Sequence, residues 1–123
     1  MAYYATLGDK ELELRNDLGV LRSFKKEFRQ TYTQVVSRLE TMTEDEWYKF
    51  IYVSMTSECK DSFGKLSDFV DWIESEESGI GVVDIMDLIQ EINLEIQYPG
   101  KTPEERKKLM MDKMKEYREM ENI

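Results

Sequence analysis

Histidine is absent from the 123 residues, and Cys59 is the only cysteine. A single cysteine cannot form an internal disulfide, and a chain without histidine lacks the usual nitrogen ligand of zinc and the commonest general base. The sequence therefore excludes disulfide-framework proteins and every mechanism that uses imidazole, and it fits a reducing cytoplasm. We predict that Cys59 is a packing residue.

The chain also lacks long apolar runs and phosphate-binding loops. It has no run of eighteen apolar residues and no charged-then-apolar leader, so neither membrane spanning nor secretion is indicated. It has neither a GxGxxG loop between a strand and a helix nor a loop that ends in Lys-Ser or Lys-Thr. We therefore expect no cofactor, no metal and no enzymatic activity.

Charge is plentiful but unevenly distributed along the chain. The formal net charge is -9, yet residues 10 to 39 hold seven basic and four acidic side chains, whereas residues 40 to 95 hold three and fifteen. An acidic surface repels phosphate, so direct binding of nucleic acid is not expected. The acidic residues indicate either a solubilising surface or an imitation of DNA toward a basic partner. In the DNA-mimic hypothesis, the residues that imitate DNA phosphates would be Asp68, Asp71, Asp84 and Asp87.

The first segment predicts a β-hairpin. Apolar and polar residues alternate over residues 3 to 7 and again over residues 11 to 15, and Gly8 and Asp9 stand between these two runs. Glycine favours the positive φ of a tight turn. Two strands alone are marginal in water, so the hairpin is expected to pack on helices or to pair with another chain.

Two helices are expected next. Apolar residues three and four apart predict a helix over residues 18 to 39, and the β-branched Thr31 and Thr33 leave open whether it is continuous. The stretch TEDE predicts a capping box in which Thr43 and Glu46 exchange hydrogen bonds at the start of a second helix.

The sequence predicts two more helices in the body. We expect the third to begin at Asp61 or Ser62 and the fourth at about Val82, with glycines in ESEESGIG permitting the turn between them. The fourth helix has an unusually wide apolar surface, which indicates contacts on two sides.

After the fourth helix, the sequence predicts a helix-breaking turn and then the start of another helix. Pro99 and Gly100 end the fourth helix, and Thr102, Pro103 and Glu105 have the pattern of a capped helix start. We therefore predict a mainly α fold, with a compact bundle of four to five short helices, a small N-terminal β-hairpin and a C-terminal helical arm. The predicted domains are residues 1-98 and 99-123.

Methionines are concentrated in the predicted arm. Methionine adapts to irregular apolar surfaces and recurs in helices that fit a partner's groove. Packing of the arm against its own body is the alternative. The residues that we predict to bind a partner are Met110, Met111, Met114 and Tyr117 in the arm, with Leu88 and Leu94 in the fourth helix.

The order of elements resembles that of the small tail assembly chaperones of long-tailed bacteriophages. The stretches that carry the resemblance are the hairpin LGDKELELR, the helix start Leu18-Gly19-Val20, and the two acidic-capped segments TEDEWYKFIYVSM and SFGKLSDFVDWIE. It spans most of residues 5 to 97. The resemblance implies a protein that coats the tape measure protein, keeps its apolar helices soluble and helps recruit the tail tube protein. It also implies the cytoplasm of an infected bacterium and absence from the mature virion.

The sequence thus leaves two alternative hypotheses for the function. The first is a tail assembly chaperone that forms homo-oligomers and binds protein partners. The second is a small acidic phage-encoded inhibitor that blocks a host nucleic-acid-binding protein by imitating DNA. Self-association would favour the first, whereas dependence of partner binding on the four aspartates would favour the second.

Overall fold

A computed structural model describes residues 2 to 121 and begins with the predicted hairpin. Strands β1 (Ala2–Leu7) and β2 (Lys10–Arg15) are antiparallel, and Leu7 pairs with Lys10 across the turn. Gly8 has a φ of 62°, so it supplies the left-handed conformation that the turn requires. The hairpin packs on helices of its own chain, because β1 contacts α6 and the backbone N–H of Thr56 donates to the carbonyl of Glu13 at 3.0 Å.

The first long helix of the sequence is two helices in the structure. Helix α1 (Gly19–Phe28) ends at Arg29, which has a left-handed φ of 57°. Helix α2 (Tyr32–Ser37) then starts from a capping box between Thr31 and Gln34, and a short 3-10 turn, η1 (Leu39–Thr41), follows it. Thr31 caps a new helix, so the helix is interrupted there although the spacing of the apolar residues continues.

Helix α3 (Glu44–Ser54) begins at the predicted capping box of Thr43 and Glu46, which is confirmed. The prediction for the next helix is wrong. Asp61 and Ser62 lie inside α4, which covers Ser57–Phe63. Gly64 ends this helix with a φ of 101°, and the next helix, α5, covers Leu66–Glu74. The described residues form six α-helices in the body, α1 to α6, rather than the expected four or five, and α7 is the arm. The number is higher because residues 19 to 37 and 57 to 74 each divide into two short helices.

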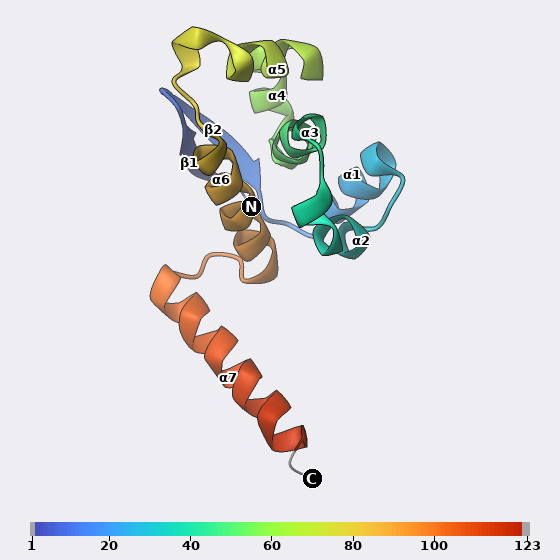
Figure 1. The fold of residues 1–123 in the computed structure, drawn as a ribbon, viewed down its shortest axis with the longest axis vertical. Helices are drawn as coiled ribbons and strands as arrows, with labels where there is room; N and C mark the ends of the chain where they lie inside the picture. The colour runs from blue at the N-terminus through green and yellow to red at the C-terminus, as the bar shows by residue number, and fades with distance from the viewer. Residues whose placement is uncertain (1, 122–123) are drawn as a thin grey trace.

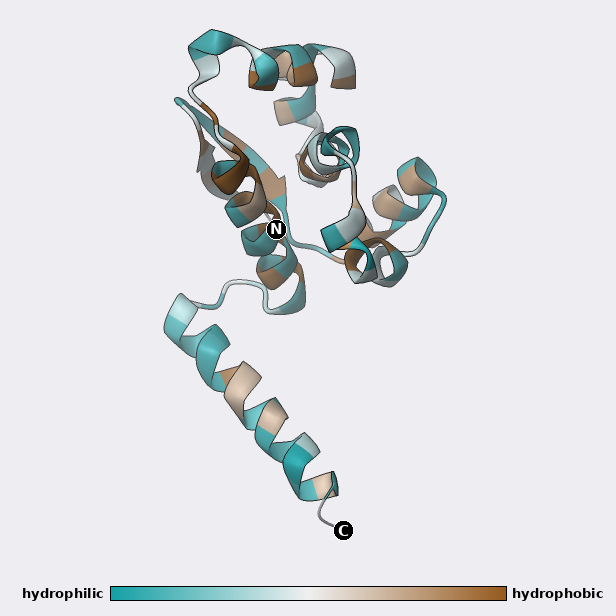
Figure 2. Cartoon of the chain, in the orientation of Figure 1, coloured by the Kyte–Doolittle hydropathy of each residue, from teal (hydrophilic) through white to brown (hydrophobic). Residues whose placement is uncertain are grey.

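Helix α6 (Val82–Gln97) crosses the body after the short 3-10 turn η2 (Glu76–Ser78). In Figure 1 the hairpin and α6 lie on one side of the body, α3 lies in the middle, and α1 and α2 lie on the other side. The core forms between these layers, and Figure 2 shows hydrophobic residues along the strands and helices that border it. Its largest fully buried side chains are Phe24, Phe50, Phe69, Leu7, Leu12, Leu14, Ile51, Met55, Ile89 and Ile92.

The last element is α7 (Pro103–Glu121), which leaves the body at the end of α6 and points away from it (Figure 1). Its start is capped as the sequence predicts, because the Thr102 hydroxyl accepts from the backbone N–H of Glu105 at 3.1 Å. The chain reverses before this cap at Gly100, which has a φ of 71°. The predicted arm extends to residue 123, of which residues 122 and 123 lie outside the described part of the chain.

Candidate protein-binding site

Arg106 joins the arm to the body. Its Nη1 atom donates to both carboxylate oxygens of Glu91, at 2.9 and 3.0 Å, and its Nη2 atom donates to Glu95 at 3.1 Å. The residue is 6% exposed, whereas every other described residue of α7 is exposed. The arm is therefore held to α6 at its first turn, and the described residues of α7 beyond Arg106 are exposed to solvent.

The site of this contact is buried and incompletely paired. Within residues 2 to 121, neither the second carboxylate oxygen of Glu95 nor the Nε atom of Arg106 has a hydrogen-bond partner, and the same holds for the Tyr3 hydroxyl. Burial, together with the negative charges of Glu95 and Glu91, raises the pKa of Tyr3 above its ordinary value. The phenol therefore stays neutral beside two carboxylates and adds no further charge to the site.

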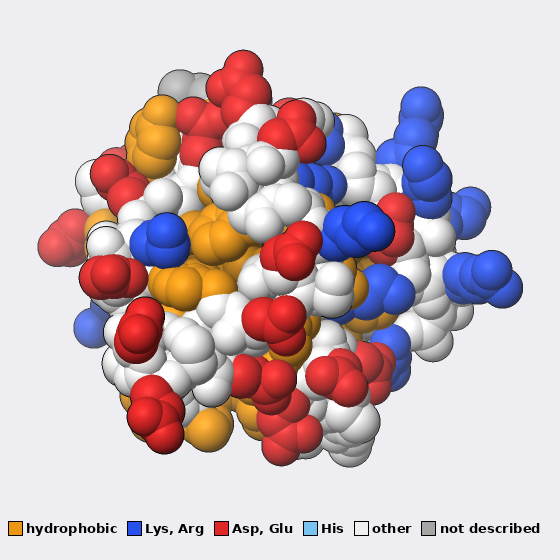
Figure 3. Space-filling view, turned by 90° about the horizontal axis from the view of Figure 1, so that it is seen from above, with side chains coloured by type: hydrophobic (Ala, Val, Ile, Leu, Met, Phe, Trp, Pro, Cys, Tyr) orange, Lys and Arg blue, Asp and Glu red, His pale blue; other side chains and the backbone are white. Residues whose placement is uncertain are grey.

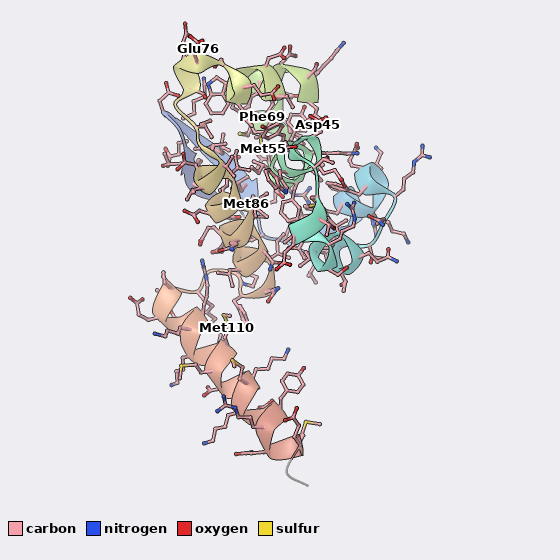
Figure 4. All side chains as sticks on the ribbon, in the orientation of Figure 1. Asp45, Met55, Phe69, Glu76, Met86 and Met110 are labelled. Carbon is pink, nitrogen blue, oxygen red and sulfur yellow. The ribbon has the colours of Figure 1, made fainter. Side chains whose placement is uncertain are left out.

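Four of the predicted binding residues form an exposed apolar surface on the arm. Met110, Met111, Met114 and Tyr117 are all exposed, and Figure 4 shows Met110 on the first half of α7, just beyond the end of α6. The first three line a groove of about 370 Å³ with Leu94 of α6, which is half-buried. We call this surface the arm stripe, defined by Met110, Met111, Met114 and Tyr117.

Leu88 does not belong to this surface. It is 5% exposed and packs in the core, because helical spacing places it with Ile85 and Ile92 on the inner face of α6. Leu94 remains at the surface because it lies on the other side of the helix, next to Pro103 and Arg106. The wide apolar surface of α6 thus serves the core on one side and the base of the arm on the other.

Sequence reasoning missed Arg106 and Glu95, although a signal was present for both. Arg106 stands four residues before Met110 in the apolar stripe of the arm, and Glu95 follows Ile92 by three residues on the apolar face of α6. A charged residue in an apolar stripe indicates a buried ion pair when the neighbouring element offers the opposite charge. The predicted binding set also omits Leu109 and Met120, which are exposed on the arm.

The four aspartates of the DNA-mimic reading are exposed, but two of them have a structural role. Asp68 accepts the backbone N–H of Lys65 at the start of α5, and Asp84 accepts that of Gly81 at the start of α6, both at 2.8 Å. Capping of a helix N-terminus accounts for a carboxylate at these two positions. The arrangement therefore gives the DNA-mimic reading no specific support.

Over the described range 2 to 121, no group of three or more acidic or cysteine side chains is placed to hold a metal ion. No helix in this range is long and apolar enough to cross a membrane. No family model, curated protein or solved structure matches the chain.

Proposed function

We propose that the protein is a non-enzymatic tail assembly chaperone of a long-tailed bacteriophage, which acts in the cytoplasm of the infected cell. Its clients are the tape measure protein and, at a later step, the tail tube protein. The observation that carries the proposal is the arm stripe, an apolar surface exposed along a helix that extends away from an acidic body. The resemblance of residues 5 to 97 supports the same function.

The geometry suits a long helical client. Methionine side chains are flexible and polarizable, so one stripe of them can pack against successive, non-identical apolar segments. The groove with Leu94 extends this surface onto the body, and the Arg106 anchor fixes where it begins. The net charge of -9 opposes aggregation of the complex once the apolar surface of the client has been covered.

The test is co-expression with the tape measure protein encoded in the same genome. We compare the wild type with Met110→Ser/Met114→Ser, which makes the stripe polar, and with Lys108→Ser/Lys115→Ser as a control. The control removes two exposed, helix-favouring lysines of α7 that are not part of the arm stripe. We expect the soluble fraction of the tape measure protein to fall several-fold with the stripe variant and to stay at the wild-type level with the control. Equal solubility with both variants would overturn the proposal.

A further inference from the structure

Helix α1 carries an exposed basic stripe. Arg22, Lys25 and Lys26 of α1 and Arg29, the residue that caps its C-terminus, are all exposed and follow the spacing of one helix face. Within residues 2 to 121, none of these four forms an ion pair with a carboxylate. Figure 3 shows basic side chains gathered at the edge of the molecule where α1 lies, and acidic side chains spread over the rest of that face.

An apolar groove lies beside the basic stripe. Leu18 is 75% exposed and borders a groove of about 400 Å³ between α1, α2 and the end of α6. Arg22, Lys25 and Arg29 follow Leu18 by four, seven and eleven residues, so helical spacing places them on the side of α1 that carries Leu18. They do not line the groove itself, and we call them its rim. The surface therefore fits an amphipathic helix that has acidic residues beside its apolar face. We call it the receiver groove; its apolar lining residues are Leu18, Leu21, Tyr32, Val36 and Ile96.

Helix α7 has the matching pattern. Asp112, Glu116 and Glu119 are exposed and lie four and three residues apart, on one face of the arm. Two exposed apolar residues border this acidic face at helical spacing: Leu109 lies seven residues before Glu116, and Met120 four residues after it. At 1.5 Å per residue the helix is about 28 Å long, so these residues lie well beyond the anchor.

The arm of a chain does not face its own receiver groove. Arg106 holds α7 on the side of α6 that carries Glu91 and Glu95. The receiver groove is lined by Ile96 and Gln97, which helical spacing places about 100° and 200° around α6 from Glu95. With Arg106 in place, the helix that fits the groove is supplied by a second copy of the chain.

We propose that the arm of one copy docks in the receiver groove of the next copy. Asp112, Glu116 and Glu119 then face Arg22, Lys25 and Arg29, while Leu109 and Met120 enter the apolar groove. Because the two surfaces differ, the contact is head-to-tail and repeats into a ring or an open chain. The charged rim selects the partner and the register, and it offsets the mutual repulsion of two acidic bodies. The contact uses Leu109 and Met120 rather than the arm stripe, so it does not rest on the proposed chaperone function.

A charge exchange between full-length chains tests the contact. The variant Glu116→Lys/Glu119→Lys reverses the charge of the arm, and the variant Lys25→Glu/Arg29→Glu reverses the charge of the rim. Because all four residues are exposed, both variants are expected to keep the melting temperature within a few degrees of the wild type. The control for the arm variant is Glu76→Lys/Glu77→Lys, which makes the same change of charge in the exposed turn η2. Self-association of each protein is measured by sedimentation velocity over a range of concentrations.

We expect the wild type and the η2 control to assemble in a concentration-dependent manner. Each reversed variant alone should need at least tenfold higher concentration, and an equimolar mixture of the two should recover assemblies of wild-type size. A wild type that stays monomeric, variants that assemble as it does, or a mixture without recovery would each overturn the proposal. Solubilisation of the tape measure protein by Glu116→Lys/Glu119→Lys is measured in parallel. Retention of this activity together with lost self-association would separate the present contact from the chaperone function.

Discussion

The Nη2 atom of Arg106 lies 3.1 Å from Oε1 of Glu95, and both side chains are almost fully buried, with 7% and 8% of their surface exposed. Among the described residues of α7, Arg106 is the only one that is buried. A buried ion pair adds little net stability but a defined geometry, because the desolvation of both charges offsets most of their attraction. The pair therefore sets the direction of the arm more than it stabilises the fold.

Replacing Arg106 with methionine should release the arm. The Glu95 carboxylate would then be left without a partner, which costs about 3 to 5 kcal/mol for a group that stays buried. Separation of α7 lets water reach Glu95 and limits the loss. We expect faster amide hydrogen exchange over residues 99 to 121, with smaller changes in α3. Unchanged exchange in this range would contradict the role of Arg106 as the anchor.

The double variant Arg106→Met/Glu95→Leu is the matched control for that experiment. Removing both charges leaves no unpaired buried charge, so packing of methionine against leucine can replace the ion pair. We expect its free energy of unfolding, measured by urea denaturation, to lie within about 1 kcal/mol of the wild type and above that of Arg106→Met. Equal destabilisation of the single and the double variant would show that the charge of Glu95 is not the cause.

Much of the fold is predictable from short-range signals. The hairpin follows from alternation around Gly8, and the start of α3 follows from the capping box of Thr43 and Glu46. The breaks at Arg29 and Gly64 are less visible, because the apolar spacing continues past Arg29 and a single glycine at position 64 is tolerated in many helices. Periodicity predicts which residues face inward, but tertiary packing decides where each helix stops.

The binding surface is only partly predictable for a related reason. Pro99 and Gly100 predict that the four arm-stripe residues lie on a separate helix, but the sequence leaves open whether this helix packs on the body. The structure leaves all four exposed. Arg106 and Glu95 lie eleven residues apart on different helices, so their contact depends on how the chain reverses at Gly100. Likewise, the receiver groove combines residues of three helices that are far apart in the sequence, and no local pattern predicts such a juxtaposition.

Gly8 should tolerate substitution much less than Gly79. Both have a left-handed φ, 62° and 66°, so alanine costs about 1 to 2 kcal/mol at either position for the backbone conformation alone. A Cβ atom at Gly8 also meets the carbonyl oxygen of Ser78 at 2.8 Å and the Ile80 side chain at 2.9 Å, whereas at Gly79 it meets nothing within 4 Å. We therefore expect Gly8→Ala to lower the free energy of unfolding at least 1 kcal/mol more than Gly79→Ala, measured by urea denaturation. Equal losses would show that the turn and the Ser78 segment are not in close contact.

Two half-buried tyrosines should make the protein sensitive to alkali. Burial is the main cause that raises the pKa of both Tyr3 and Tyr32 above the ordinary value of 10.0. A phenol with a raised pKa in the folded state is neutral in both states below pH 10, so its effect on stability is constant there. Above pH 10 the unfolded chain ionises first, and stability falls by as much as about 1.4 kcal/mol per pH unit for each such tyrosine.

Phenylalanine substitutions separate this titration from hydrogen bonding. The Tyr32 hydroxyl donates to Asn93 at 2.6 Å, whereas that of Tyr3 has no partner within residues 2 to 121. At pH 7 we therefore expect Tyr32→Phe to lower the free energy of unfolding by about 0.5 to 1.5 kcal/mol and Tyr3→Phe to leave it unchanged or slightly raised. Between pH 10 and 11.5 each variant should lose stability less steeply than the wild type, because one phenol no longer ionises on unfolding. Urea denaturation at pH 7, 10 and 11.5 measures both effects, and a pH dependence identical to that of the wild type would show that these phenols are not shielded from water.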